Sequence, residues 1–415
     1  MTEISELLKG KTDCGCGRVH TCPVKQVYIG KNAAQKLPEL TAGYRNILLA
    51  ADENTWRVAG IPAAEMLGER VAARCVFETG NALLIPDETA VRRLRDAVPG
   101  DCDLILGIGS GVINDLCKYV SHSCGLPYDI FATAPSMDGF ASVGAALILN
   151  GMKITRDARP PRGIYADTAV LAASPLRMRQ AGWGDIIGKY SCLNDWKLSC
   201  ALLGEYFCPY VHDLMLGAAE RVRPLAAAVR NGEENAVAQL MEALVVAGIA
   251  MSYVGNSRPA SGSEHHLSHY FEITGILREK AYLPHGIDVL CSAVLTAELR
   301  ERMCKGSPRR KELPDWRADI CRIYATSAEG IIALQEKTGH YGNDADFPED
   351  WERIRDILAD AQGTSGMRAM VGEIGLSMTE FLDLYGPEQI EDGLLYAKDL
   401  KDRYTVLWLY YVYFR

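Results

Sequence analysis

The sequence lacks the features that would assign it to several specialised classes of protein. It has no excess of basic charge, because 44 Lys and Arg stand against 53 Asp and Glu and the formal net charge is −9. Phosphate neutralisation needs a basic face, so DNA or RNA is not expected as a partner. No apolar run reaches the roughly 18 residues of a transmembrane helix, and the opening MTEISELLKGKTD has no apolar signal core. We therefore expect a cytoplasmic protein without a membrane span.

The cysteines lack the even count of a disulfide framework. Thirteen of them are scattered over 415 residues, which suits reduced thiols in the cytosol. Most are expected to be small buried hydrophobic side chains. The chain also has no internal repeat and no low-complexity segment. At roughly 100–200 residues per domain, its length predicts two or three domains.

Up to about residue 170, short apolar runs alternate with helix-like stretches. Asn46–Ala51 is followed by a helical pattern over Thr55–Leu67, and Asp103–Gly107 is almost wholly apolar, as strands buried on both faces are. This alternation predicts βαβ units in a largely parallel sheet, with ligands at the carboxyl ends of the strands. Within Ala146–Ile154, the pair Asn150-Gly151 predicts a two-residue hairpin turn.

Beyond residue 170, helical periodicity dominates. Helices are predicted over Leu214–Val229, Glu234–Val254, Val289–Met303, Trp316–Glu336, Pro348–Ala361 and Ile390–Tyr411. The fold class predicted is α/β plus all-α. A Rossmann-like parallel-sheet domain over residues 1–170, with a Cys/His-containing leader over 1–23, precedes a helical metal- and substrate-binding domain over 171–415. The active site is expected in the cleft between them, because such sites concentrate between domains.

A glycine-rich loop follows the predicted strand DLILG, in the run GIGSGVINDLCK over residues 107–118. Glycines let backbone N–H groups approach a phosphate, and the helix that follows adds unpaired donors. The other interpretation is a tight strand–helix turn that binds no ligand. Asp52 ends the neighbouring strand, where an acid can bind a ribose 2′-hydroxyl and favour NAD over NADP. It can equally be a carboxylate at the helix N-terminus before Thr55.

Histidines gather in one part of the chain, four of the eight lying within 21 positions. His265 and His269 are four residues apart and share a helical face, while His285 lies in a predicted turn. With Asp185, two imidazoles would leave coordination positions open for water or substrate, as in a catalytic metal site. Spacing alone does not say which two of the histidines bind, His266 included.

Together the motifs resemble the sn-glycerol-1-phosphate dehydrogenases, in particular the bacterial branch. This family belongs to the iron-containing alcohol dehydrogenase and dehydroquinate synthase superfamily. The resemblance extends from about Cys14 to the C-terminal helix that contains YAKDLKDRYTVL (Tyr396–Leu407). Its most specific element is SRPASGSEHHLSH (Ser257–His269). The other motifs that carry it are GWGD (Gly182–Asp185), PHG (Pro284–Gly286), GIGSGVINDLCK and APSMDGFAS (Ala134–Ser142).

The resemblance implies roles for individual residues. Asp185, His265 and His285 would hold one divalent metal, with zinc, nickel and iron(II) all acceptable. Asp185 and His269 would be the catalytic residues, and both would contact the substrate together with Asp138. The residues implied for NAD or NADP are Asp52, Gly107, Gly109, Gly111, Val112, Ile113, Asn114, Asp115, Thr133, Ser136 and Ser142.

The implied activity is the NAD(P)H-dependent reduction of dihydroxyacetone phosphate to sn-glycerol 1-phosphate by a homodimer or larger homo-oligomer. One alternative is a glycerol or polyol dehydrogenase that acts on an unphosphorylated substrate. A dehydroquinate-synthase-like cyclase is less favoured, because that branch usually has glutamate at the position of Asp185. A more distant alternative is a non-catalytic regulator that binds nucleotide or metal. Arg258, Lys189 and Lys280 are candidates for the substrate phosphate, and each could equally be a surface charge.

The leader CGCGRVHTC contains four soft-metal ligands, Cys14, Cys16, His20 and Cys22. Such clustering could make a small zinc knuckle. Its spacing is tighter than that of common zinc modules, and no second pair of ligands follows. From the sequence alone we therefore favour reduced cysteines that bind no metal.

Overall fold

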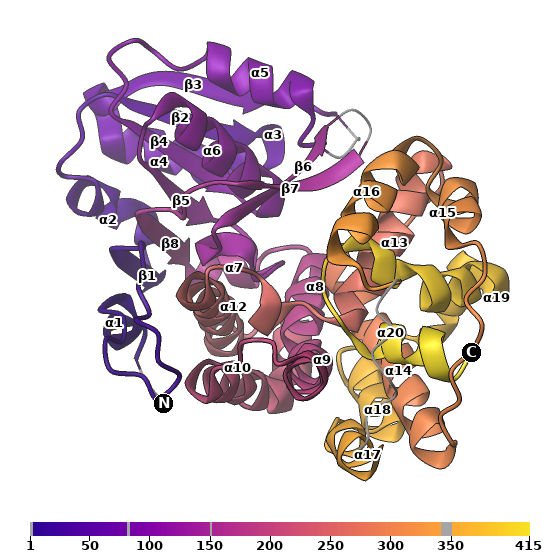
Figure 1. Ribbon diagram of the computed structural model, residues 1–415. Helices are drawn as coiled ribbons and strands as arrows, with labels where there is room; N and C mark the ends of the chain where they lie inside the picture. Colours follow the sequence, from indigo (N-terminus) through magenta and orange to yellow (C-terminus); the bar gives the residue numbers. More distant parts are fainter. Residues whose placement is uncertain (1–2, 81–83, 150–151, 342–350) are drawn as a thin grey trace. The chain divides into compact units, whose positions relative to one another are not determined.

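The computed structural model describes residues 3–80, 84–149, 152–341 and 351–415 (Figure 1). Backbone packing divides the chain into two compact units. The first unit is Met1–Ile186 with Glu220–Ser257, and the second is Ile187–Ala219 with Arg258–Arg415. The first contains a parallel sheet and the second is helical in the described residues, so the predicted fold class is confirmed.

A six-stranded parallel sheet forms the centre of the first unit, in the order β1-β8-β5-β4-β2-β3 (Figure 1). Two of its inner strands, β2 and β4, are apolar and almost completely buried, which is why continuous hydrophobic runs predicted them. The strands are β1 (Gln26–Gly30), β2 (Ile47–Asp52), β3 (Val71–Phe77), β4 (Leu104–Gly109), β5 (Tyr128–Ala132) and β8 (Gly163–Asp167).

Helices cover both faces of this sheet. Because side chains alternate along a strand, Leu106 and Ile108 of β4 enter the core that α2 (Ala33–Leu40) and α4 (Ile61–Leu67) share. The glycines of β4 face the other way, toward α6 (Gly111–Cys124). Helix α5 (Glu88–Asp96) packs beside α6. The sheet is therefore wound on both sides, as the sequence predicts.

The order in which successive strands are added to the sheet reverses between β2 and β4. Strand β3 lies outside β2 on one side, whereas β5 lies beyond β4 on the other. Ala51 pairs with Ile108, so Asp52 and Gly109 end these two strands side by side. Open α/β sheets bind ligands at such a switch point, outside the carboxyl ends of the strands.

Two strands outside the main sheet form the predicted hairpin. β6 (Gly144–Leu149) and β7 (Met152–Asp157) pair antiparallel, while the turn residues 150 and 151 lie outside the described residues. Strand β8 was not predicted. It is only five residues long and closely follows the Pro160-Pro161 pair.

The first unit extends beyond the predicted join at residue 170. It includes α7 (Thr168–Ala172), most of α8 (Leu176–Ile187), α11 (Ala226–Asn231) and α12 (Glu234–Val254). Helix α12 has the predicted bounds and packs against α7, α1 (Ile4–Leu8) and the short helix η3 (Gly139–Ala141). Gly248 permits this approach, because a Cβ there would lie 2.7 Å from the backbone nitrogen of Ala141.

Helix α12 resembles a membrane-spanning helix in length and composition. Its 21 residues are long and apolar enough to cross a membrane, with a mean hydropathy of 1.7 over the best window. However, 78% of that window is buried inside the protein, as is usual for the core helix of a globular unit. The length and composition of the helix are those of a membrane span, but its position is that of a core helix.

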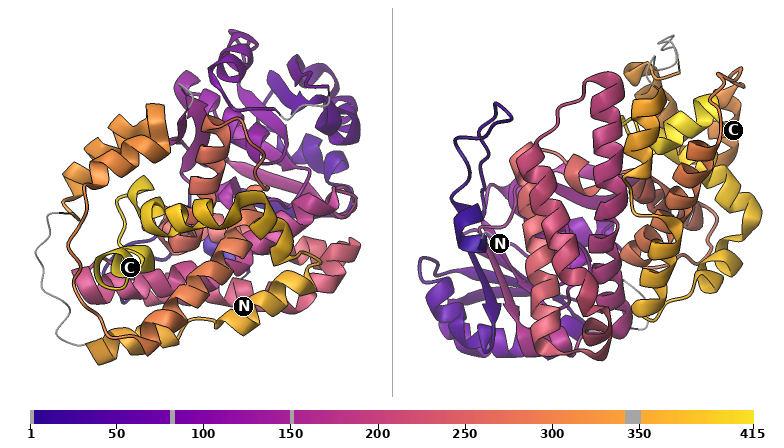
Figure 2. Two further views of the ribbon diagram at one scale, coloured as in Figure 1. Left: turned by 90° about the vertical axis from the view of Figure 1, so that its right-hand side faces the viewer. Right: turned by 90° about the horizontal axis from the view of Figure 1, so that it is seen from below.

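The second unit has no strand among its described residues. Its central helix α14 (His285–Lys305) packs against α13 (Ser263–Leu277), α17 (Trp351–Ala359) and α18 (Thr364–Glu373). Figure 2 shows α17 and α18 in orange to yellow. The remaining helices that lie wholly in this unit are α9 (Lys189–Leu203), α15 (Trp316–Tyr324), α16 (Ala328–Thr338), α19 (Met378–Tyr396) and α20 (Val406–Tyr413).

Three predicted helices are each broken in two. Leu214–Val229 becomes α10 (Pro209–Val222) and α11, because Pro224 lies in the 3₁₀ turn between them. The helix predicted over 316–336 breaks at Ala325, which has a positive φ of 44°. The one predicted over 390–411 breaks after residue 400, where residues 401–405 are non-helical. Residues 348–350 of another predicted helix lie outside the described residues.

Candidate functional site

The glycine loop joins β4 to α6 at the switch point of the sheet. A Cβ on Gly109 would lie 2.6 Å from the Cβ of Ile113, and one on Gly107 would lie 2.9 Å from the Sγ of Cys117. These two glycines therefore let α6 pack directly on β4. Close packing accounts for both of them without a ligand, so their predicted contact with a dinucleotide stays a prediction.

The first turn of α6 presents groups suited to an anion. The N–H groups of Gly111, Val112 and Ile113 have no acceptor within the helix, whereas that of Asn114 donates to the carbonyl of Ser110 at 2.9 Å. The buried Oδ1 of Asn114 has no partner among the described residues. Donors at a helix N-terminus and an unused amide oxygen beside them suit a nucleotide phosphate and its ribose.

The other residues predicted for the cofactor surround this turn. The hydroxyls of Ser110 and Ser136 form a hydrogen bond, and the N–H of Thr133 donates to the carbonyl of Gly109 at 3.0 Å. Thr133 is buried at the carboxyl end of β5, and Ser142 is buried at the end of η3. The structure thus brings together the segments that end β4 and β5.

Asp52 caps the helix after β2, the second of its two interpretations. Its Oδ1 accepts the N–H groups of Asn54 and Thr55, each at 2.8 Å, and Thr55 completes a capping box. A carboxylate oxygen that is already bonded orients the whole group, and the second oxygen can still accept a ribose hydroxyl. The cap and the cofactor interpretation are therefore compatible.

Lys118 is a residue of this region that the sequence analysis did not single out. Its side chain is completely buried in α6, and its Nζ donates to the carbonyls of Gly139 at 2.8 Å and Gly144 at 3.0 Å. It also lies 3.8 Å from the carboxylate of Asp115. Burial lowers the pKa of Lys118, while Asp115 and Asp138 act in the opposite direction. Lys118 fastens α6 to the segment that contains Asp138.

Two predicted acids meet within the first unit. Asp185 is fully buried in α8, and its Oδ2 accepts the backbone N–H of Asp138 at 2.9 Å. Asp138 itself is largely buried at the start of η3. The SMDG turn and the GWGD motif, 47 residues apart, thus lie together in space.

Three histidines meet within the second unit. The ring centroids of His265 and His285 are 5.1 Å apart, those of His269 and His285 are 5.4 Å apart, and those of His265 and His269 are 6.2 Å apart. His265 and His269 come from one face of α13, and His285 is the first residue of α14. Imidazoles at this spacing suit zinc, nickel or iron(II).

Polar neighbours orient two of these rings. The Nδ1 of His265 lies 2.6 Å from Glu264, whose carboxylate also accepts the N–H of Gly262. Burial acts to raise the pKa of Glu264. The hydrogen bond and the charge interaction with His265 act to lower this pKa and outweigh the effect of burial, so the net shift is downward. The Nδ1 of His285 lies 3.1 Å from the hydroxyl of Ser268. Such partners usually fix the rings of metal-binding histidines.

His266 occupies different surroundings from its neighbour. Its side chain is completely buried, and neither ring nitrogen has a partner among the described residues. Burial and the positive charges of Lys401, Arg403 and Arg258 lower its pKa well below the usual value. It is therefore held as a neutral ring in the protein interior.

The three candidates for the substrate phosphate lie in unlike places. Arg258 is buried, pairs with Glu205 at 2.9 Å and donates to backbone carbonyls. Lys189 is buried and donates to the carbonyl of Ala260 at 3.0 Å. Lys280 is exposed. Contacts within the protein already occupy the first two, so neither is singled out as a phosphate ligand.

A cavity of about 360 Å³ lies elsewhere in the first unit, beside α2 and α4. Asn32, Met66, Phe131 and Asp167 are among its lining residues. None of the residues predicted for the metal, the substrate or the cofactor lines it. We therefore assign it no part in the chemistry.

Comparison with known proteins finds relatives along almost the whole chain. Residues 28–175 match the iron-containing alcohol dehydrogenase family. The chain is 33% identical over 414 residues to glycerol-1-phosphate dehydrogenase (NAD(P)+) of Bacillus licheniformis, with 97% of this chain and 93% of that protein aligned. The protein of the same name from Bacillus subtilis is 31% identical, over 93% of this chain and 91% of its own length.

Solved structures with the same fold are more distant in sequence. A mutant of an archaeal halo-thermophilic alcohol dehydrogenase from a Red Sea brine pool superposes with a TM-score of 0.61 at 16% identity, covering 90% of this chain and 91% of that one. A 1,3-propanediol oxidoreductase superposes with a TM-score of 0.60 at 17% identity, covering 91% and 94%. At such identities the likeness is one of fold.

Proposed function

The chain belongs to the glycerol-1-phosphate dehydrogenase family of iron-containing alcohol dehydrogenases, and from this premise we propose that it reduces dihydroxyacetone phosphate to sn-glycerol 1-phosphate with NADH or NADPH. The observation that carries the proposal is the 33% identity that extends over 97% of the chain. An alignment that covers 97% of the chain extends over both units.

We propose that Asp185, His265 and His285 hold one divalent metal. One carboxylate and two imidazoles leave coordination positions open, as a catalytic site requires. The buried state of Asp185 and the hydrogen bonds of His265 and His285 to Glu264 and Ser268 support this choice. When bound, the metal would supply a Lewis acid that polarises the carbonyl of the substrate.

The remaining roles belong to side chains around these ligands. His269 would donate a proton from its ring to the substrate oxygen as the carbonyl becomes an alcohol. Its ring centroid lies 5.4 Å from that of His285, which supports this role. Asp138 would accept a hydrogen bond from a substrate hydroxyl and orient the ketone. Its backbone bond to Asp185 fixes the turn from which it would do so.

The glycine loop would bind the dinucleotide, whose nicotinamide supplies the hydride. The free N–H groups at the start of α6 would donate to the pyrophosphate, and Asp52 would accept hydroxyls of the adenosine ribose. A carboxylate in that position disfavours a 2′-phosphate, so we propose a preference for NAD over NADP. We further propose that the enzyme acts in the cytoplasm, which the odd number of its cysteines, thirteen, supports, and as a homodimer or larger homo-oligomer.

The test is NADH oxidation with dihydroxyacetone phosphate, run on metal-free protein and again after adding zinc, nickel or iron(II). Coupling enzymes specific for sn-glycerol 1-phosphate or 3-phosphate identify the product. Metal-dependent formation of the sn-1 product is expected. Turnover of glycerol or dihydroxyacetone, with dihydroxyacetone phosphate inert, would instead establish a polyol dehydrogenase. Tight cofactor binding without turnover of any of them would favour a regulator.

A further inference from the structure

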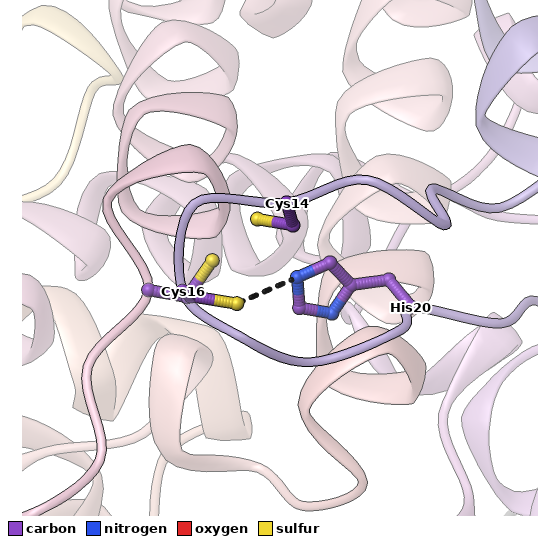
Figure 3. Close-up of side chains that lie close together, drawn as sticks. Cys14, Cys16 and His20 are labelled. Carbon is purple, nitrogen blue, oxygen red and sulfur yellow. Dashed lines mark hydrogen bonds between the residues drawn. The ribbon is translucent and has the colours of Figure 1, made fainter.

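The N-terminal leader forms a closed loop in the first unit. Lys11 and His20 pair as an antiparallel bridge with both N–H···O bonds at 2.9 Å, so the two ends of the loop are held together. Within it, the N–H of Gly17 donates to the carbonyl of Cys14 at 3.0 Å, and Gly17 has a φ of 78° that favours glycine. This turn brings the side chains of Cys14 and Cys16 toward His20 (Figure 3).

The donor atoms of these three residues are spaced as ligands of one ion. The two sulfurs and an imidazole nitrogen all lie within 4.8 Å of one another, and the Sγ of Cys16 is 3.3 Å from the Nε2 of His20. Zinc binds sulfur at about 2.3 Å and nitrogen at about 2.0 Å, so its tetrahedral ligands are roughly 3.4–3.8 Å apart. A small adjustment of side chains would meet that geometry.

A second observation concerns the other nitrogen of His20. Its Nδ1 lies 2.9 Å from the backbone carbonyl of Tyr253, in the last turn of α12, and the ring is stacked on that of Tyr253. A carbonyl oxygen only accepts, so Nδ1 carries the hydrogen and the lone pair is on Nε2, facing the thiols. Histidines that bind zinc are typically held in this way by a carbonyl or carboxylate. His20 is also almost completely buried.

We propose that Cys14, Cys16 and His20 bind one zinc ion in a structural site separate from the catalytic residues. Two thiols would lose their protons as the ion binds, and two thiolates with a neutral imidazole balance the charge of Zn²⁺. A hydrogen bond from Cys16 to His20 would explain why these two side chains lie close together. A bound ion would also explain why the sulfur of Cys14 lies close to both of them. The site would fasten the leader to the end of α12.

From the sequence alone, cysteines that bind no metal are favoured, whereas the fold favours a metal site and a smaller set of ligands. Tyr253 follows His20 by 233 residues, so no local spacing reveals its contact with the imidazole. Cys22 completes the cluster in the sequence, but its sulfur is not among the donor atoms of the described residues that lie within 4.8 Å of one another here. The proposal therefore rests on three residues, and the fourth position is left to water or another cysteine.

Cobalt(II) substitution of the full-length protein tests the proposal directly. The protein is stripped of metal under reducing conditions and titrated with cobalt, and thiolate-to-cobalt charge-transfer absorption is followed. The proposed catalytic ligands are oxygen and nitrogen atoms, so any thiolate absorption reports on a different site. The catalytic site can also take cobalt, so we expect this absorption to saturate by two added cobalt ions per chain, with the intensity of a single thiolate-bound ion, whether or not the chain reduces dihydroxyacetone phosphate.

Three variants locate the site. Cys14→Ser with Cys16→Ser should abolish the thiolate absorption, while Cys22→Ser and the matched control Cys124→Ser, which removes an exposed thiol of the same unit, should keep it. Absence of thiolate absorption in the wild-type protein, or its full retention in the double variant, would overturn the proposal.

A measurement on the wild-type chain guards against a double variant that does not fold. Zinc-loaded and chelator-treated proteins are alkylated with iodoacetamide, and the peptides are identified by mass spectrometry. Zinc should protect Cys14 and Cys16 from alkylation, while the exposed Cys124 and Cys321 react equally in both samples. Equal alkylation of Cys14 and Cys16 with and without zinc would contradict the site.

Discussion

The two units hold their candidate site residues by different means. In the first unit, the side chains are held mainly by backbone groups: Asp185 accepts the backbone N–H of Asp138, and Lys118 donates to two backbone carbonyls. In the second, side chains hold side chains, as Glu264 holds His265 and Ser268 holds His285. A backbone group survives substitution of its own residue, whereas a side-chain partner does not. Single substitutions should therefore affect the second unit more locally and more sharply.

The sharpest test of the comparison uses two adjacent histidines of α13. His265→Ala should lose the metal and reduce kcat/KM by more than the roughly 10–100-fold that loss of an outer partner costs. His266→Ala removes the same atoms one residue further on, from a ring buried in the interior, and should keep the metal. Metal analysis and steady-state kinetics check both variants. Full activity in metal-free His265→Ala protein would refute the assignment.

The corresponding test in the first unit is Lys118→Met. It removes a fully buried charge that links α6 to the carbonyls of Gly139 and Gly144. Leaving these carbonyls and Asp115 without their cation should cost about 3 kcal/mol of stability. Lys36→Met is the control, because Lys36 forms an exposed pair with Glu39 worth less than about 1 kcal/mol. Urea unfolding of both variants measures the difference, and equal midpoints would show that Lys118 links nothing.

A smaller effect is expected from Glu264→Gln. The substitution keeps the shape of the side chain but removes the charge that stabilises the N–H of His265, so metal affinity should fall by about 10–100-fold. Competition with a chelator measures the affinity. Glu336→Gln, which alters an exposed pair with Arg317, should change nothing. An unchanged affinity in Glu264→Gln would mean that His265 is oriented by packing alone.

The smallest effect concerns the choice of cofactor. Asn caps helices about as well as Asp, so Asp52→Asn should preserve the helix start while removing the charge. The ratio of kcat/KM for NADPH to that for NADH should rise about 5- to 10-fold, since two charges about 4 Å apart in water exchange ~1 kcal/mol. Thermal unfolding provides the control for the cap. A ratio that does not move would leave Asp52 with its capping role only.

Local pattern was sufficient for most of the sheet and for one long helix. The buried runs of β2 and β4 were visible as continuous apolar residues, and α12 was predicted with its observed bounds. Strand β8 was missed, because five residues after a proline pair carry too little periodicity. The breaks at Ala325 and after residue 400 were missed because no proline marks either of them in the sequence, unlike the break at Pro224.

The candidate site was predictable only in part. The i, i+4 spacing gives His265 and His269 a common face of a helix. It does not predict that His285 or Asp138 belongs to the same site, and those assignments came from family resemblance. Lys118 was visible as a lysine three residues after Asp115, yet its burial depends on the carbonyls of a distant segment. Tertiary contacts of this kind leave no trace in local spacing.

The pairing of β1 with β8 has a consequence for how the chain is made. The first strand finds its partner only when residues 163–167 have left the ribosome, and His20 meets Tyr253 only 233 residues after its own synthesis. At about 5–20 residues per second, the second delay lasts roughly 12–47 s. Throughout that time the cysteines of the leader are on an undocked segment of nascent chain. The leader therefore cannot reach its final place until Tyr253, in the last turn of α12, has been synthesised.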